Sequence, residues 1–263
     1  MIPKKIHYCW FGGNPLPDSA KRYIETWKKY CPNYEIIEWN ENNFDIAQNQ
    51  YCKEAYEAKK WAFVSDYARF WILYKYGGIY FDTDVEVIKP LDDIVAKGPF
   101  MGCERDGDKN KAAAIADAFV LGVNPGLGLG VNPGLGLGVN PGHELYKEIL
   151  DLYDTLHFKN KDGSFNLKTV VEYTTEILLK YGLKDINQIQ CCACIYIYPT
   201  EYFCPQNIDT GVLKITENTY TIHHFEGTWL TPWLKFRHKL KILLIKLLCS
   251  NFRLMKLKNK KFL

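Results

Sequence analysis

The chain lacks a long apolar run of the kind that crosses a membrane. The apolar run Ile242 to Ile245 is far too short, because a spanning helix takes about 20 residues. No signal peptide is evident in Met1 to Lys5, and the nine cysteines lack regular spacing. We therefore expect a cytoplasmic protein in a reducing compartment, without a disulfide framework.

Paired Cys-x-x-Cys spacing is also missing, although structural zinc sites commonly use it. The cysteines that lie closest together in the sequence are Cys191, Cys192, Cys194 and Cys204. Buried free thiols are favoured for this group, and a structural zinc site is the alternative.

Acidic residues are absent from residues 227–263, which hold ten Lys or Arg. The net charge of +3 for the whole chain therefore hides a net charge of −7 for residues 1–226, which hold 23 basic and 30 acidic residues. No nucleic-acid-binding motif accompanies the basic segment, so a nucleic-acid partner is not expected.

The basic segment has an amphipathic pattern. If residues 235–248 are helical, one apolar stripe is flanked by lysines; the stripe comprises Phe236, Leu240, Leu243 and Leu247. This pattern is typical of a helix that lies on an anionic membrane surface. The alternative is a C-terminal helix docked on the domain with a solvated basic face. Peripheral attachment to the cytoplasmic face of a membrane is the expectation.

The most informative segment is Gly77 to Asp84, with the sequence Gly-Gly-Ile-Tyr-Phe-Asp-Thr-Asp. An apolar strand leads directly into two carboxylates, and residues two apart on a strand face the same way. Asp82 and Asp84 can then share one divalent cation, while two aspartates in a turn that only bond locally are the alternative. Oxygen ligands suit Mg²⁺ or Mn²⁺, which would bridge the phosphates of a nucleotide sugar.

A helix is predicted over Trp61 to Tyr76, immediately before the two glycines. Asp66 and Arg69 are three residues apart and therefore neighbours on one face of it. They form either an ordinary helical ion pair or part of a site beside the carboxylates. In the site, Arg69 would hold a phosphate or keep Asp66 ionised, and Asp66 would accept hydrogen bonds from donor hydroxyls.

Four blocks in this order resemble the glycosyltransferases with a sugar-binding region and a DXD motif. These are family 32 enzymes, including capsular and exopolysaccharide transferases, and they are distantly similar to large glucosylating bacterial toxins. The resemblance covers most of residues 1–229. The blocks are Ile6 to Gly13, Ser65-Asp66-x-x-Arg69, Gly77 to Asp84, and His223-His224-x-x-Gly227-x-Trp229.

The resemblance implies a GT-A type nucleotide-sugar-binding fold: α/β, with a mixed, mainly parallel central sheet flanked by helices. It also implies roles for single residues. Trp10 would stack on the nucleobase, Tyr80 would lie near the base and ribose, and Trp229 would close over the diphosphate. Ser65, Asp66 and Arg69 would line the donor pocket, with Asp66 and Arg69 reaching the sugar. Asp82 would contact ribose, sugar or metal, and Asp84 would be the direct metal ligand.

His223 and His224 are neighbours, so on a strand they cannot both point into one cleft. We expect His224 to be the third metal ligand, because Gly227 follows it by three residues in a pattern similar to that of related transferases. Neutral imidazole is an acceptable partner for two carboxylates around manganese.

Alternating strands and helices predict a βαβ-dominated layout. Strands are expected at 5–10, 34–39, 85–88, 100–104, 118–121, 195–198 and 220–224, and helices at 18–30, within 51–76, and at 145–156 and 169–181. Ligands bind beyond the carboxyl ends of strands in such sheets, which is where Trp10 and Asp84 fall.

An eight-residue sequence, Leu-Gly-Val-Asn-Pro-Gly-Leu-Gly, occurs twice in tandem from Leu121 to Gly136, and a third copy begins at Leu137. Three Asn-Pro-Gly turns exclude a regular helix. We interpret residues 121–142 as a duplication tolerated in a surface loop, and a flap over the acceptor side of a cleft is the alternative.

One catalytic domain is expected over residues 1–231, with residues 121–142 inserted as a loop, followed by a basic amphipathic tail at 232–263. The expected activity is metal-dependent transfer of a hexose from a nucleotide diphosphate sugar, with a UDP-hexose favoured, to a saccharide or lipid-linked oligosaccharide acceptor in surface polysaccharide synthesis. The resemblance implies retention of anomeric configuration. The alternatives are a noncatalytic membrane-associated scaffold of the same fold and a nucleotide-sugar hydrolase.

Overall fold

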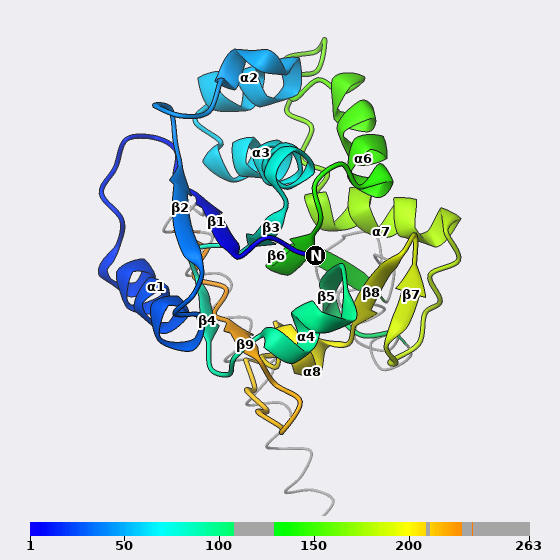
Figure 1. Ribbon diagram of the computed structural model, residues 1–263. Coiled ribbons are helices and arrows are strands. Elements are labelled where there is room, and N and C mark those ends of the chain that lie inside the picture. The colour runs from blue at the N-terminus through cyan, green and yellow to red at the C-terminus, as the bar shows by residue number, and fades with distance from the viewer. Residues whose placement is uncertain (108–128, 209–210, 228–232, 234–263) are drawn as a thin grey trace, which may run out of the picture.

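A seven-stranded sheet organises the chain in the order β2-β1-β3-β6-β5-β8-β7. The structure is a computed structural model that describes residues 1–107, 129–208, 211–227 and 233 (Figure 1). Five of the seven strands run in one direction, while β6 and β7 run in the other. The predicted α/β class with a mixed, mainly parallel sheet is confirmed. The strands are β1 (Lys5–Cys9), β2 (Glu35–Trp39), β3 (Gly78–Tyr80), β5 (Phe100–Arg105), β6 (Gly130–Val139), β7 (Gln190–Cys192) and β8 (Ile195–Tyr198).

Helices cover both faces of this sheet (Figure 1). One face carries α2 (Gln50–Glu57), α3 (Trp61–Tyr76), α6 (Glu144–Asp154) and α7 (Val170–Lys180). The other face carries α1 (Asp18–Tyr30), α4 (Asp92–Lys97), α8 (Thr200–Phe203) and a two-stranded sheet of β4 (Val85–Val87) and β9 (Thr221–His223). A 3₁₀ helix spans Ile46–Gln48.

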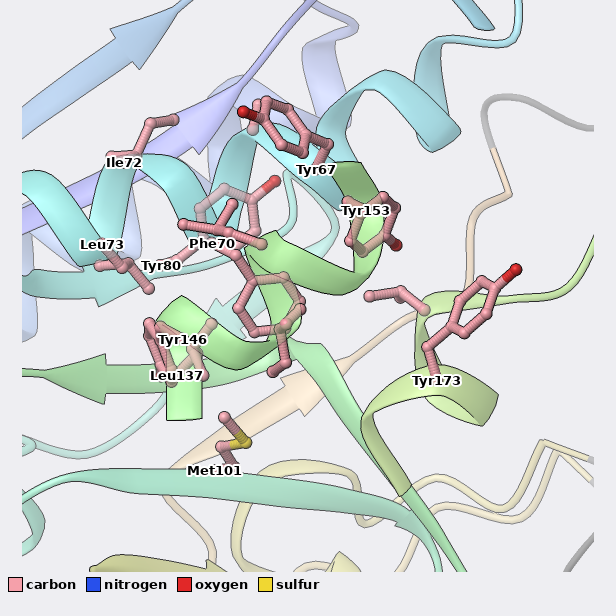
Figure 2. Packing of buried hydrophobic residues seen from close by; sticks show 14 of the residues in the cluster. Tyr67, Phe70, Ile72, Leu73, Tyr80, Met101, Leu137, Tyr146, Tyr153 and Tyr173 are labelled. Atoms are coloured by element: carbon pink, nitrogen blue, oxygen red, sulfur yellow. The ribbon is translucent and has the colours of Figure 1, made fainter. Parts of the chain in front are cut away.

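The helix α3 is buried between the sheet and α6, so it is apolar over most of its circumference. Figure 2 shows the aromatic contact that joins the two helices: Phe70 meets Tyr146 edge to face, with ring centroids 5.3 Å apart. The helix ends at Gly77, whose φ of 62° is easy only for glycine. Because the helix ends here, the chain turns directly into β3 and leads to the edge of the sheet at which the acidic residues lie.

A second core lies on the opposite face, under α1 and the small sheet. Trp27 is fully buried there, and its indole Nε1 donates a hydrogen bond of 2.8 Å to the backbone oxygen of Val85. This contact ties α1 to the start of β4, directly after the acidic residues.

Most predicted elements are present with ends that differ by one or two residues. The helices α4 and α8, the 3₁₀ helix and the strand β7 were not predicted. The predicted strand at 118–121 and the predicted tail helix at 235–248 lie outside the described residues.

The largest departure concerns the repeat. The strand β6 lies in the middle of the sheet, between β3 and β5, so the prediction of a surface loop is wrong for Gly130–Val139. This part of the repeat is buried because its valines and leucines face the two cores and its small glycines admit close neighbours. At Gly138, an added Cβ would lie 2.1 Å from the ring of Phe100.

The Asn-Pro-Gly sequence still makes a local turn contact inside this strand. The side-chain oxygen Oδ1 of Asn132 accepts a hydrogen bond of 2.7 Å from the backbone nitrogen of Gly134. Pairing with β5 jumps from Leu137 to Asn132 between two consecutive residues of β5, so the residues between them bulge from the ladder. Pro133 lies in this bulge, which explains how a central strand holds a proline.

Deleting residues 121–128 is expected to leave stability nearly unchanged. The deletion removes one copy of the repeat and leaves Gly130–Val139 intact, so the shortened chain keeps the whole of β6. Shortening the connection between two strands changes its closure entropy by roughly 0.6 kcal/mol per halving, which is worth about 2 °C in Tm for a chain of this size. Thermal melts of both proteins measure the difference. A Tm lower by more than about 10 °C would show that the repeat number matters to the fold.

Candidate active site

A cavity of about 1030 Å³ opens where β1, β3 and β5 end and β6 begins. This is the edge of the sheet at which ligands were expected. It is lined by aromatic, acidic and small residues, among them Cys9, Trp10, Phe11, Trp61, Ser65, Asp66, Arg69, Asp82, Thr83, Asp84, Glu104, Asn132, His223, Phe225, Glu226 and Gly227.

Asp82 and Asp84 lie in a turn between β3 and β4, and not on a strand as the sequence suggested. The backbone nitrogen of Val85 donates to the backbone oxygen of Asp82 at 3.1 Å and closes the turn. On the other side, the backbone nitrogen of Asp82 donates to the backbone oxygen of Gly134 at 2.9 Å. A Cβ at Gly134 would lie 1.8 Å from Oδ2 of Asp82, so the bulge in β6 must present a glycine here.

Three side chains converge at this turn: Asp82, Asp84 and His223. One ligand atom from each lies within 4.8 Å of the others, and Nε2 of His223 is 3.0 Å from Oδ1 of Asp84. Two carboxylates and an imidazole are a donor set that Mn²⁺ accepts. These three residues therefore fit a divalent cation, as the DXD motif predicts.

The structure brings His223, and not the predicted His224, to the two carboxylates. The strand β9 pairs antiparallel with β4, with His223 opposite Val85, and this register turns His223 toward Asp84. His224 points to the other face, where its Nε2 lies 2.8 Å from Oε2 of Glu86 and its ring stacks on Tyr23 at 4.6 Å. Adjacent residues of a strand face opposite ways, so only one of the two histidines could face the carboxylates. The other, His224, contacts Glu86 and Tyr23.

The chain after β9 wraps around Asp84. The backbone nitrogens of His224 and Glu226 donate to the backbone oxygen and to Oδ2 of Asp84, each at 3.0 Å. The Glu226 carboxylate in turn accepts bonds from Ser19 at 2.7 Å and from Tyr23 at 3.1 Å, both on α1. The turn is tight enough to place Phe225 at a φ of 50°. Asp84 is thereby held in one orientation before any ligand arrives.

Asp84 and His223 form an ion pair in the absence of a ligand. Burial opposes the charged form of each, yet Asp84 raises the pKa of His223 well above 6.5, and His223 holds the pKa of Asp84 below 3.8. A cation held here would need His223 as neutral imidazole, so its binding would be coupled to loss of the His223 proton. Each of the two residues thus favours the charged form of the other.

Exchanging each histidine for alanine separates their roles. His223→Ala is expected to weaken Mn²⁺ binding by at least the 10- to 100-fold that loss of an outer partner costs, because it would remove one of the three converging ligand atoms. His224→Ala is expected to change the affinity by less than about threefold. Titrations followed by electron paramagnetic resonance of free Mn²⁺ measure both. Equal losses, or a larger loss for His224→Ala, would contradict the assignment.

Arg69 connects α3 to the acidic turn. Its Nη2 lies 2.9 Å from Oδ1 of Asp66 and 3.3 Å from Oδ1 of Asp82, and its Nε donates to the backbone oxygen of Ser65 at 3.1 Å. Its Nη1 is buried and makes no hydrogen bond within the described residues. Burial raises the pKa of Asp66 to about 7, against the opposing effect of Arg69. Arg69 is thus a buried cation between two carboxylates, and it also lines the cavity.

Tyr80 does not line the cavity, so its predicted contact with the base and ribose is corrected. Its side chain is 1% exposed and lies beneath the acidic turn because β3 places it on the α3 face of the sheet. Its hydroxyl donates to Oδ1 of Asp82 at 3.2 Å, and its ring packs on the Arg69 guanidinium. Tyr80 supports the site from below.

The remaining predicted donor residues divide into two groups. Trp10 and Ser65 both line the cavity. The indole of Trp10 donates to the backbone oxygen of Asn14 at 2.6 Å, and the Ser65 hydroxyl bonds to the backbone of Trp61 at 3.1 Å. Trp229 lies outside the described residues.

Several lining residues were not predicted. Glu104 is at the carboxyl end of a strand that the sequence did predict, so the strand-end rule could have identified it. Glu226 carries no such signal, because its role depends on the fold of the turn after β9. The cysteine group 191–204 forms no metal cluster among the described residues, and all four members are free thiols. Cys192 and Cys204 are buried as expected, whereas Cys191 and Cys194 are exposed.

No helix in the described part of the chain is long and apolar enough to span a membrane.

Comparison with known proteins agrees with this site. Residues 17–101 match the family model described as the glycosyltransferase sugar-binding region containing a DXD motif. Inositol phosphoceramide mannosyltransferase 1 of Schizosaccharomyces pombe is 27% identical over 111 residues, which are 38% of this chain and 33% of that protein. Inositol phosphoceramide mannosyltransferase 3 of the same organism is 32% identical over 102 residues, 36% of this chain and 27% of that protein. The chain thus spans about a third of the length of these relatives.

Solved structures are similar at a lower level. The PaToxG glycosyltransferase superposes with a TM-score of 0.47 at 17% identity, covering 68% of this chain and 69% of that one. The galactosyltransferase LgtC, in complex with donor and acceptor sugar analogues, gives a TM-score of 0.43 at 14% identity over 90% of this chain and 95% of that one. The family match includes Asp66, Arg69, Asp82 and Asp84. Residues 17–101 therefore match the DXD sugar-binding region of the glycosyltransferases, in agreement with the resemblance that the sequence motifs indicated.

Proposed function

We propose that the chain is a metal-dependent, retaining glycosyltransferase that moves a hexose from a nucleotide diphosphate sugar to a saccharide hydroxyl. The observation that carries this proposal is the convergence of Asp82, Asp84, His223 and Arg69 in one cavity. Trp10 lies in the same cavity, at the end of the neighbouring strand.

The donor would lie along the sheet edge. Trp10 would hold the nucleobase, and Asp82, Asp84 and His223 would hold the cation at the diphosphate. A bound Mn²⁺ or Mg²⁺ supplies charge stabilisation for the departing diphosphate. The Arg69 guanidinium, which lines the cavity, would donate to a phosphate or sugar oxygen.

In the transfer step, the bond between the anomeric carbon and the phosphate oxygen breaks, and its electron pair stays with the diphosphate. A bond forms between the anomeric carbon and the acceptor oxygen on the same face. The proton of the acceptor hydroxyl passes to the leaving phosphate oxygen. Arg69 stabilises the negative charge that gathers on that phosphate.

A donor-cleavage assay tests the proposal. UDP-glucose, UDP-galactose and GDP-mannose are incubated with the protein and Mn²⁺, with and without excess chelator, and nucleotide release is measured. Metal-stimulated release with a donor is the expected result. A noncatalytic scaffold would release nothing with any donor, and a hydrolase would release the nucleotide at a rate that added saccharide acceptors leave unchanged.

The identity of the sugar has two candidates. A UDP-hexose is proposed because the Trp10 block is similar to that of uridine-using relatives. The names of the two yeast relatives favour a mannose donor instead. Thermal-shift measurements of each nucleotide sugar with Mn²⁺ separate them, since a bound donor raises the Tm.

The basic tail is the basis for a proposed location. Its ten cationic residues without acidic ones suit an anionic lipid surface, such as the cytoplasmic face of a membrane where surface polysaccharide is made on a lipid-linked acceptor. Pelleting with anionic vesicles compares the full chain with a chain ending at Trp233. Equal binding by both would rule out a role of the tail.

A further inference from the structure

The cavity continues past the acidic turn to the ends of two more strands. Along the sheet edge, β1 is followed by β3, β6 and β5. Trp10 follows β1 and Asp82 follows β3, whereas Asn132 lies near the start of β6 and Glu104 near the end of β5. All four residues line the cavity. The proposed donor site uses only the part of the cavity that lies at β1 and β3.

Spacing along the edge separates two sugar positions. Neighbouring strands are about 4.8 Å apart, so β5 lies about 10 Å from β3, on the side away from β1. One strand spacing is about the width of a sugar ring. A donor whose base lies at Trp10 and whose diphosphate lies at Asp82 would place its hexose over β6, and the next sugar would lie over β5.

The β5 end presents a positioned carboxylate. The amide Nδ2 of Asn132 donates to Oε2 of Glu104 at 2.7 Å, and the amide oxygen of Asn132 is itself fixed by the backbone nitrogen of Gly134. Asn132 is 8% exposed and cannot turn freely. No donor from the described part of the chain bonds to Oε1 of Glu104, which leaves that oxygen to a ligand.

The surrounding wall suits a sugar ring. Val170 and Val171, at the start of α7, line the cavity together with Glu104. The side chains of Val171 and Glu104 are both neighbours of Gly130. Apolar side chains beside one carboxylate match a sugar, which has a CH face and hydroxyl donors. A carboxylate at this position would repel an acceptor that carries its own negative charge.

We propose that Glu104, held by Asn132, binds a hydroxyl of the acceptor and selects uncharged saccharides over uronic acids or phosphorylated sugars. This inference rests on the proposed glycosyltransferase function and adds the acceptor position to it. Glu104 is a specificity residue, and the donor site does not depend on it.

Steady-state kinetics of Glu104→Gln test the proposal. The acceptor KM is expected to rise about tenfold or more, the usual effect of losing a hydrogen bond to a charged group, while the donor KM stays within about threefold. The preference for a neutral over a uronic-acid acceptor is expected to fall, because the repelling charge is gone. Glu104→Asp, which keeps the charge, should retain that preference. Glu176→Gln, an exposed change on α7, is the matched control and should alter none of these values.

The outcomes are distinct. An unchanged acceptor KM and an unchanged acceptor preference would overturn the inference and leave the proposed function intact. Equal losses in donor KM and in donor cleavage without acceptor would also overturn it, because they would place Glu104 at the donor. A wild-type protein that cleaves no donor would end the proposed function and this inference together.

Discussion

Asp84→Ala is expected to remove metal-stimulated sugar transfer while the fold survives. Asp84 contributes one of the three converging ligand atoms and holds His223 in place at 3.0 Å. Loss of one group that stabilises developing charge typically costs 10²- to 10³-fold in kcat, and here the cation itself would also be lost. We therefore expect at least a 10³-fold decrease in turnover and no response to added Mn²⁺.

The control for this variant is Glu86→Ala, a carboxylate two residues away that pairs with His224 outside the cation cluster. Glu86→Ala should keep metal-stimulated turnover within about threefold of wild type. Turnover and Mn²⁺ titrations of both variants, with thermal melts to confirm folding, make the comparison. Retained metal stimulation in Asp84→Ala would refute the metal assignment.

Arg69→Met is expected to lower stability as well as activity. Arg69 is buried between Asp66 and Asp82, and its removal leaves both carboxylates without their cation. Breaking a buried ion pair by removing one partner costs about 3 to 5 kcal/mol, which corresponds to a Tm lower by roughly 10 °C in a chain of this size. The pKa of Asp66, already about 7, would rise further because Arg69 is the group that lowers it.

A second substitution shows that this loss comes from the uncompensated carboxylate. Adding Asp66→Asn to Arg69→Met should recover part of the lost Tm, because the neutral amide costs less to bury. Activity should not recover, since the guanidinium is still missing. If Arg69→Met alone had the Tm of wild type, the charge of Arg69 would not stabilise the fold.

The sequence predicted those parts of the site that are close together in the chain. Asp82 and Asp84 are fixed near each other by a short turn, and Asp66 and Arg69 by one turn of a helix. Whether the two aspartates sat on a strand or in a turn made no difference to their convergence. These motifs are local, so local rules identified them.

The choice between His223 and His224 could not be made locally. It depends on the register of β9 against β4, and a shift of one residue would exchange the two faces. Gly227 gave no information about that register. Long-range pairing also determines the positions of Glu104 and Glu226, which reach the cavity from the end of β5 and from the turn after β9.

The repeat was misassigned for a different reason. Its Asn-Pro-Gly turns predict a loop by every local rule, and β6 contradicts them only because residues 133–136 bulge from the ladder while Leu137 to Val139 pair with β3. Burial against two cores outweighs the local preference for a turn. The same bulge supplies the glycine that the Asp82 carboxylate requires.

The most direct test of the central claim is a crystal structure of the protein with Mn²⁺ and UDP, in which anomalous scattering locates the manganese. The account predicts one manganese peak between Asp82, Asp84 and His223, bonded to the diphosphate, with the uracil at Trp10. A peak elsewhere, or a diphosphate bound away from these three side chains, would contradict it.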